Sequence, residues 1–198
     1  MRLPAGQVLF RAGDSGDGCY RVEDGLLKLT MVSKSGTERI LAFHGPGDIV
    51  GVRAIIDALP RPMSAVAVRD AVLSFLSRTA FEGFAGKHPE LCQSLLRLLT
   101  NRMRERDKML AANSFLMVKG RIAQTLLELA EHFGQEVGPG RIVIRQRISQ
   151  YDLAAMVGAG REAVVRTLSN WQRRKLVSRR RSGCYCLENK ALLELEID

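Results

Sequence analysis

The sequence predicts an α+β protein: an antiparallel β-domain, then a long helix, then a helix-turn-helix with a β-wing. Three observations carry this prediction. Residues 1 to about 78 alternate apolar and polar positions between glycine-rich turns, which is typical of half-buried strands. From Pro89 the apolar period changes to about 3.5 residues, which is typical of a long helix with one apolar face. The pattern of residues 148–176 predicts two short amphipathic helices joined by a glycine turn.

The β-domain is predicted from four apolar segments with turn residues between them. Asp24-Gly25 predicts a hairpin, because type I′ turns need a positive φ that glycine supplies freely. Ser35-Gly36 and Gly45–Asp48 predict further turns. Together these signals favour a small antiparallel barrel or sandwich. The segments are GQVLFRAG, CYRVEDGLLKLTMV, TERILAFHGPGDIVG and MSAVAVRDAVLSFLS.

A long helix is predicted over residues 89–117, with an apolar seam whose members recur at alternating spacings of four and three. Such a seam needs a partner, either a second copy of the chain or the chain's own barrel. We expect a homodimer, and the two polar seam residues fit this, since polar seam positions commonly fix register and oligomeric state. The seam comprises Cys92, Leu96, Leu99, Met103, Arg106, Leu110, Asn113 and Met117.

After the long helix, the pattern predicts a helix over 119–133, a loop over 134–140 and a short strand over 141–144. Ser149 predicts the start of the next helix, because Asp152 stands three residues later in a capping-box position.

That helix is expected to end near Gly158, and the second helix of the pair to run from about Arg161 to Arg174. Residues 176–178 and 184–187 predict a two-stranded wing.

The positive charge of the chain lies mainly in this C-terminal part. The net charge is +9, and the segment from Gly138 to Arg181 alone holds eleven basic and two acidic residues. Basic charge concentrated in this way is typical of a protein that binds a polyanion. The alternative is a solvated charged face on an ordinary soluble domain.

Other classes of protein are disfavoured by what the sequence contains. The apolar runs are too short to span a bilayer and no export signal follows Met1, so we expect a cytoplasmic protein that does not enter membranes. The four cysteines form no CxxC pair, and we expect reduced thiols and no bound metal. We expect no enzyme: the three histidines are isolated, whereas a cupin-type metal enzyme would need two or three together.

The order of these motifs resembles the Crp/Fnr family of bacterial transcription regulators over essentially all 198 residues. The resemblance rests on GRIAQTLLELA (120–130), on DLAAMVGAGREAVVRTLSNWQRRKLVS, and on the GDIVG that ends the glycine-punctuated segment. It implies a β-roll sensor domain that resembles cyclic-nucleotide-binding domains (1–88), a dimerisation helix (89–117) and a winged helix-turn-helix (118–198). It also implies a homodimer on double-stranded DNA, with a pseudo-palindromic operator, and contact with RNA polymerase during activation.

The family's reading-helix pattern R-E-x-x-x-R stands here as Arg161, Glu162 and Arg166. By resemblance, the two arginines contact guanines and the glutamate a cytosine in a TGTGA-like half-site, with about 1–3 kcal/mol of discrimination for each such pairing. The alternatives are phosphate contacts or a solvated position for the arginines, and an ion pair between Glu162 and Arg166. Gly160 stands where the family usually has serine. The residues expected to contact phosphates are Arg145, Arg147, Gly160, Lys175, Arg179 and Arg180.

The sensor departs from the family's cyclic-nucleotide pattern. In members that bind cyclic AMP, the phosphate-binding segment resembles G-E-L followed, after a short turn, by R-S-A. This chain has Gly51-Val52-Arg53 and Met63-Ser64-Ala65 at the corresponding positions. Valine accepts no hydrogen bond from a ribose, and methionine offers no charge to a phosphate. The Thr-Ser pair that meets adenine corresponds to Arg106-Asp107. We therefore expect no cyclic AMP cofactor and no control by cyclic AMP in the usual way.

Other inputs stay open at this point. Arg53 and Arg61 lie near the degenerate segment and leave a different anion possible, and a redox signal is a further alternative. Arg106 has another possible role, an ion pair with Asp107 or Glu105 of the partner subunit that holds the dimer without a ligand. Iron–sulfur sensing would need an N-terminal cysteine cluster, but only Cys19 lies there.

Three further expectations concern His44, the N-terminal helix of the family and a different mode of DNA binding. His44 is expected to be structural rather than a haem ligand. The helix that precedes the barrel in the family is missing or very short. A nonspecific architectural DNA binder is the remaining functional alternative, but that function does not need Glu162 beside Arg161.

Overall fold

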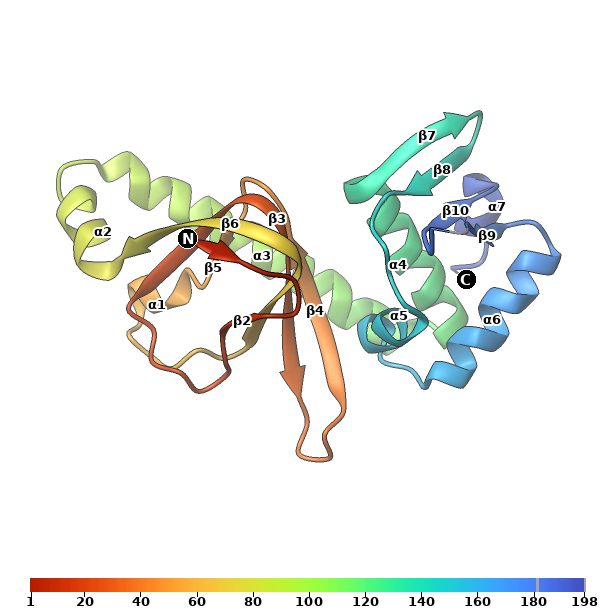
Figure 1. Cartoon of the computed structure of the whole chain (residues 1–198), viewed down its shortest axis with the longest axis horizontal. Helices are drawn as coiled ribbons and strands as arrows, with labels where there is room; N and C mark the ends of the chain where they lie inside the picture. Colours follow the sequence, from red (N-terminus) through yellow and green to blue (C-terminus); the bar gives the residue numbers. More distant parts are fainter. Residues whose placement is uncertain (181, 198) are drawn as a thin grey trace. The chain divides into compact units, whose positions relative to one another are not determined.

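The computed structural model describes residues 1–180 and 182–197 (Figure 1). Arg181, which was counted in the basic segment, lies outside the described residues. The chain forms two compact units, Met1–Arg102 and Met103 to the C-terminus, and their boundary falls within the long helix α3 (Pro89–Phe115). Among the described helices, none combines the length and apolar character needed to cross a membrane.

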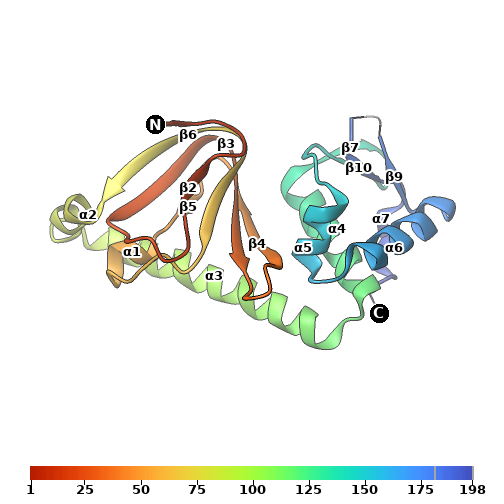
Figure 2. The ribbon, with the colours of Figure 1, turned by 60° about the horizontal axis from the view of Figure 1, so that its bottom comes forward.

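The N-terminal unit is built on a six-stranded antiparallel sheet, so the predicted antiparallel β-domain is confirmed. Its main path runs β1-β6-β3-β4, while β2 also pairs with β6 and β5 with β3 (Figure 2). The strands are β1 (Arg2–Leu3), β2 (Val8–Phe10), β3 (Gly18–Val32), β4 (Glu38–His44), β5 (Ile49–Val50) and β6 (Ser64–Ser77).

Strand β3 is longer than predicted, because the chain does not turn back at Asp24-Gly25. The predicted hairpin there is wrong: β3 continues through both residues and pairs with β6 from Gly18↔Ser77 to Thr30↔Ser64. Gly25 does have the positive φ, +95°, but it serves an irregularity in the β3–β6 register. A Cβ at Gly25 would lie 2.3 Å from the Asp70 carbonyl oxygen, so the close approach of β6 also requires glycine.

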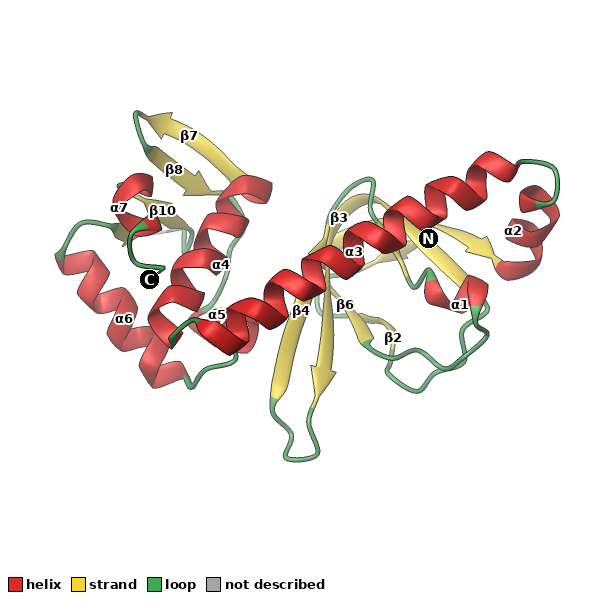
Figure 3. Cartoon of the chain, turned by 180° about the vertical axis from the view of Figure 1, so that it is seen from behind, coloured by secondary structure: helices red, strands yellow, loops and turns green. Residues whose placement is uncertain are grey.

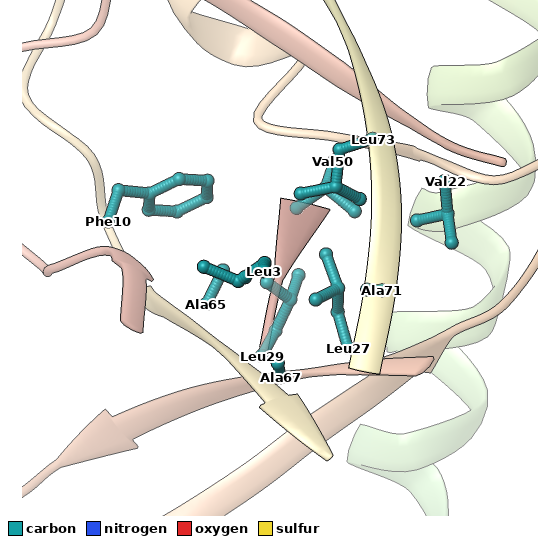
Figure 4. Close-up of a cluster of buried hydrophobic side chains, with 10 residues drawn as sticks. All are labelled: Leu3, Phe10, Val22, Leu27, Leu29, Val50, Ala65, Ala67, Ala71 and Leu73. Carbon is teal, nitrogen blue, oxygen red and sulfur yellow. The ribbon is translucent and has the colours of Figure 1, made fainter. Parts of the chain in front are cut away.

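The other predicted turns are confirmed. Gly36 (φ +82°) lies in the β3–β4 hairpin, and Gly47 (φ +92°) lies between β4 and β5. The N-terminal unit contains a cluster of buried apolar side chains (Figure 4). These are Leu3, Phe10, Val22, Leu27, Leu29, Val50, Ala65, Ala67, Ala71 and Leu73.

Two short helices, α1 (Arg53–Ile56) and α2 (Arg78–Ala85), accompany the sheet, and α3 follows. No residue of α3 is buried in the single chain, although the helix carries the predicted apolar seam. The prediction that the helix extends to residue 117 is wrong by two residues. Met117 has an extended backbone (φ −66°, ψ 164°) and is the N-cap of α4 (Val118–Phe133), so it does not continue the seam.

The C-terminal unit contains α4, three further helices and a four-stranded antiparallel sheet in the order β7-β8-β10-β9 (Figure 3). The wing prediction is confirmed as the hairpin of β9 (Val177–Arg179) and β10 (Tyr185–Leu187). The predicted loop over 134–140 is wrong, because Gly134–Gly138 forms β7 and pairs with β8 (Arg141–Ile144). Its residues are mostly exposed, so this strand has no apolar alternation to reveal it.

Candidate nucleic-acid interface

Helices α5 (Gln150–Val157) and α6 (Arg161–Arg173) form the predicted helix-turn-helix. Ser149 begins α5 with a full capping box: its hydroxyl accepts the Asp152 amide at 2.9 Å, and its own amide donates to the Asp152 carboxylate at 3.2 Å. Gly158 ends α5 in the left-handed region (φ 64°, ψ 46°), where glycine costs least. The chain then turns at once into α6, as the glycine spacing predicted.

Helix α6 has one buried and one exposed face. Val164, Leu168 and Trp171 form the buried stripe, each at most 2% exposed, and they anchor the helix in the unit. Figures 1 and 3 show α6 at the outer edge of the C-terminal unit. The helix is therefore held on one side and open on the other, which is the arrangement a DNA-reading helix requires.

Arg161, Glu162 and Arg166 are all exposed. At about 100° per residue, Glu162 and Arg166 lie about 40° apart and directly opposite the buried stripe. Arg161 lies about 100° round the helix from Glu162, closer to the buried stripe, and is exposed because it is the first residue of α6; it lies about 7.5 Å along the axis from Arg166. No ion pair joins Glu162 to Arg166 in the part of the chain that the structure describes, so both side chains remain available to a ligand.

Four of the predicted phosphate contacts gather around the wing. The Arg147 guanidinium lies beside Gly183, where an added Cβ would come within 2.9 Å of Arg147 Nε. The Cys184 thiol donates to the Arg145 carbonyl at 3.8 Å, so the residues that lead into β10, Gly183 and Cys184, lie beside residues 145–147. Arg179 and Arg180 lie on the other arm of this hairpin, and the Arg179 guanidinium lies 5.8 Å from the Tyr185 ring centroid. Residues 145, 147, 179 and 180 are all exposed.

The other two predicted phosphate contacts, Gly160 and Lys175, lie at opposite ends of α6, about 22 Å apart along its axis. Gly160 is the N-cap and provides no side-chain hydrogen bond, so the first amides of α6 have no side-chain acceptor there. Lys175 follows the helix with a positive φ of 55°.

Not every basic residue of this segment is free for a polyanion. Arg141 forms an ion pair with Glu188 at 2.8 Å, and Arg174 forms one with Glu196 at 2.6 Å. The charge count from sequence therefore overstates the cations that this surface offers to DNA.

Most residues of the degenerate sensor segment pack against or bond to other parts of the chain. Val52 is 3% exposed, and Met63 packs against the apolar cluster of the barrel. The Ser64 hydroxyl accepts the Ala12 amide at 3.0 Å. Arg53 is exposed at the start of α1. Arg106 and Asp107 are exposed on the part of α3 that belongs to the other compact unit, so they are not placed relative to this segment.

Arg61 fills the space beside Gly51. Its side chain is buried and donates to the Gly51 carbonyl at 2.9 Å and to the Gly18 carbonyl at 2.8 Å. The guanidinium carbon lies 4.4 Å from the Phe10 ring centroid, a cation–π contact. A Cβ at Gly51 would lie 2.3 Å from the Arg61 guanidinium, so there is no free space between these residues. Arg61 Nε is buried without a hydrogen-bond partner among the described residues.

Sequence reasoning missed two structural side chains. Arg78 donates to the Ala54 carbonyl and to the Gly16 carbonyl, both at 2.8 Å, and so links α1 to the loop that precedes β3. Glu196 is a nearly buried carboxylate near the C-terminus that bonds to α6. Neither carried a periodic signal, because their partners lie 22 to 77 residues away.

Comparison with known proteins agrees with this geometry. Residues 1–88 match the model of the cyclic nucleotide-binding domain, and residues 120–195 match that of the Crp-like helix-turn-helix domain. The chain is 33% identical over 191 residues to the CRP-like cAMP-activated global transcriptional regulator of Mycobacterium tuberculosis, covering 96% of this chain and 81% of that protein. It is 36% identical over 165 residues to the cyclic AMP receptor protein of Thermus thermophilus, covering 83% and 73%.

Solved structures show the same fold. FixK2 from Bradyrhizobium japonicum superposes with a TM-score of 0.87 at 19% identity, covering 100% of this chain and 96% of that one. TTHA1359, a Crp/Fnr-family transcriptional regulator from Thermus thermophilus, gives 0.82 at 27% identity, covering 100% and 97%.

Proposed function

Because this chain belongs to the Crp/Fnr family of transcription regulators, we propose that it binds a pseudo-palindromic operator as a homodimer and reads TGTGA-like half-sites with α6. The observation that carries the proposal is the exposure of three side chains on α6: Arg161 at its N-terminal end, and Glu162 and Arg166 opposite its buried stripe. Two-fold symmetry of the dimer would place the half-sites about one helical turn apart. When the protein activates transcription, it would also contact RNA polymerase.

The chemistry of reading follows from these three side chains. A guanidinium donates two parallel hydrogen bonds to O6 and N7 of guanine, and a carboxylate accepts one from N4 of cytosine. The wing arginines and the open first turn of α6 would contact phosphates, which fix the position of the helix without selecting a base.

Replacing Arg161 tests this role. We expect Arg161→Ala to weaken binding to a TGTGA palindrome by about 1–3 kcal/mol and to relax preference at one base pair. Arg173→Ala is the matched control, because it removes the same charge from the exposed C-terminal end of α6. Affinities for the palindrome and a scrambled duplex should be measured at one salt concentration. Equal affinity of the wild-type protein for both duplexes would defeat the specific-regulator proposal in favour of an architectural binder.

The dimer proposal rests on α3. Leu96, Met103 and Leu110 recur every seven residues and are 64%, 65% and 66% exposed in the single chain. Leu99 and Asn113 belong to the same seam. An apolar stripe of this length on a helix without buried residues favours a second copy as the partner.

We further propose that cyclic AMP does not control this regulator in the usual way, although two relatives are named for it. Val52 and Met63 replace the residues that would hold ribose and phosphate, and Arg61 is already bonded to two carbonyl groups beside Gly51.

Calorimetry with cyclic AMP and cyclic GMP tests the effector proposal. We expect no saturable binding by the wild-type chain at up to about 100 μM ligand, a concentration at which even a complex with a micromolar Kd would be detected. We also expect no change in DNA affinity when either nucleotide is added. Saturable binding of either nucleotide, together with tighter binding to DNA, would overturn it. The same titration with inorganic phosphate and sulfate distinguishes a different anion.

A further inference from the structure

The C-terminal segment places one carboxylate directly against the reading helix. The Glu196 side chain is 7% exposed and accepts three donors. Trp171 Nε1 donates at 2.9 Å, a guanidinium nitrogen of Arg174 lies at 2.6 Å and Lys119 Nζ at 3.2 Å. A buried carboxylate needs such partners, because an unpaired charge away from water is costly.

The three donors come from two helices. Trp171 belongs to the buried stripe of α6 and Arg174 is the C-cap of that helix, whereas Lys119 lies in the first turn of α4. The C-terminal segment itself is held on α4 at Gly120, where a Cβ would lie 2.2 Å from the Ile197 carbonyl oxygen. Glu196 therefore links the start of α4 to the C-terminal end of α6.

We propose that Glu196 is a positioning residue for the reading helix: it fixes the orientation of α6 so that Arg161, Glu162 and Arg166 meet the bases in register. Arg161 lies ten residues from Trp171, or about 15 Å along the helix. A tilt of about 10° at Trp171 would move the Arg161 Cα by about 2.6 Å, several times the roughly 0.5 Å within which a binding group must be held. The contacts at the C-terminal end of α6 therefore control the position of Arg161 at its N-terminal end.

The proposal rests on the DNA-reading role of α6 and adds a consequence for charge. Arg174 and Lys119 neutralise Glu196, so they stabilise the fold rather than attract phosphates. If Glu196 loses its charge, these cations are released and attraction to any DNA rises, while the accuracy of reading falls. Loss of the Glu196 charge should therefore lower the sequence specificity and raise the affinity for DNA of any sequence.

The variant Glu196→Gln tests this, because it keeps the shape and one acceptor but removes the charge. Glu194→Gln is the matched control: it makes the same charge change on α7 (Lys190–Glu194), where the side chain is 52% exposed and lies 3.7 Å from Lys190 Nζ. Binding to the TGTGA palindrome and to a scrambled duplex is measured at one salt concentration. We expect the ratio of specific to nonspecific affinity to fall about tenfold in E196Q and to stay within about twofold in E194Q.

A second measurement needs no DNA. Trp171 is the single tryptophan of the chain, so its emission reports directly on the bond to Glu196. We expect E196Q to shift the emission and to speed amide hydrogen exchange in α6, with little change in β7 and β8. Ile144→Val, which removes a methyl group from the buried core of the same unit, serves as the control for general loss of stability.

The outcomes separate the two proposals. A wild-type protein without sequence preference would defeat the reading function, and the exchange data would still decide whether Glu196 holds α6. A wild-type protein with sequence preference, together with an E196Q variant of unchanged ratio or unchanged exchange in α6, would overturn the role of Glu196. An equal loss of specificity in Ile144→Val would overturn it as well, since any loss of stability would then have the same effect.

Discussion

At the scale of single residues, the first turn of α6 is open at Gly160. The backbone there (φ −64°, ψ 144°) suits any residue, and a Cβ would meet no heavy atom within 4 Å. Glycine at this N-cap is therefore not required by conformation or by space. What it changes is chemical, because no hydroxyl is present to cap the helix or to contact a phosphate.

We expect Gly160→Ser to stabilise the protein by a few tenths of a kcal/mol, roughly the difference between serine and glycine at an N-cap. The added hydroxyl should also strengthen binding to specific and scrambled duplexes alike, since phosphate contacts do not select bases. Urea unfolding and DNA titration measure the two effects. Gly160→Ala, which lacks the hydroxyl, should produce neither gain; if it matches the serine variant, the cap explanation is wrong.

Gly25 shows which structural property the Asp24-Gly25 pair predicts and which it does not. Asp24-Gly25 correctly indicated a residue with positive φ, but the same φ serves a turn or an irregular register within a strand. The choice depends on β6, whose Asp70 carbonyl approaches Gly25 from 45 residues away. Local sequence therefore predicts the dihedral angle and not the direction of the chain.

Two alanine variants separate strain from crowding. Gly36→Ala should cost about 1 kcal/mol of unfolding free energy, because φ is +82° but the surroundings are open. Gly25→Ala should cost at least about 2 kcal/mol, since a methyl group would also press on the β6 backbone. Chemical denaturation measures both, and equal costs would show that β6 moves aside freely.

The candidate site was predictable where it depends on periodicity and was not where it depends on long-range contacts. The exposure of Glu162 and Arg166 follows from helical spacing opposite an apolar stripe, and that of Arg161 from its place at the start of the helix. Arg61 was placed near the sensor segment, but its bonds to Gly18 and Gly51 needed the folded sheet. Glu196 gave no signal at all, because a glutamate near a C-terminus is usually solvated.

At the scale of elements, α3 is a helix with no buried residue in the single chain, and its Leu96, Met103 and Leu110 are mostly exposed. Its heptad spacing was visible in the sequence, and its end was not, because Leu116 still donates to the Ala112 carbonyl before the backbone turns at Met117. Helix ends are set by capping contacts of one or two residues, which periodicity does not report. The strand β7 escaped prediction for a related reason, since pairing with β8 and not burial defines it.

A charge in the seam should separate the proposed dimer. We expect Leu110→Glu to weaken dimerisation about 100-fold or more, because each copy loses an apolar contact and gains a buried charge. Lys108→Glu introduces the same side chain at an exposed α3 position outside the seam and should leave the dimer intact. Sedimentation velocity measures the mass, with about twice 22.0 kDa expected for the dimer. A monomeric wild-type protein at micromolar concentration would contradict the seam's role.

At the scale of the whole molecule, acid should weaken both units. Burial raises the pKa of Glu196, but hydrogen bonds from Trp171, Arg174 and Lys119 outweigh it and leave that pKa below its ordinary value. In the N-terminal unit, burial also raises the pKa of Asp48. Hydrogen bonds from His44 and the Gly45 amide outweigh this effect and leave that pKa below its ordinary value. Each group stabilises the fold fully above its unfolded-state pKa, about 4, and loses this contribution as the pH falls through its lower folded-state value.

The difference in unfolding free energy between wild type and Glu196→Gln should therefore shrink as the pH falls from 5 towards 3, roughly the range below the ordinary carboxyl pKa. Urea titrations at several pH values measure this difference. A gap between the two proteins that does not depend on pH would show that the carboxylate charge is not the source of the stability.

The long pairing of β3 with β6 has a consequence for synthesis of the chain. Strand β3 is finished at Val32, but β6 is complete only at Ser77, about 45 residues later. At roughly 5–20 residues per second, the ribosome would need about 2–9 s to supply the partner strand. During that interval the apolar positions of β3, including Val22, Leu27 and Leu29, have no β6 to cover them. The nascent chain is therefore most exposed to aggregation and chaperone capture before the helix-turn-helix has been made.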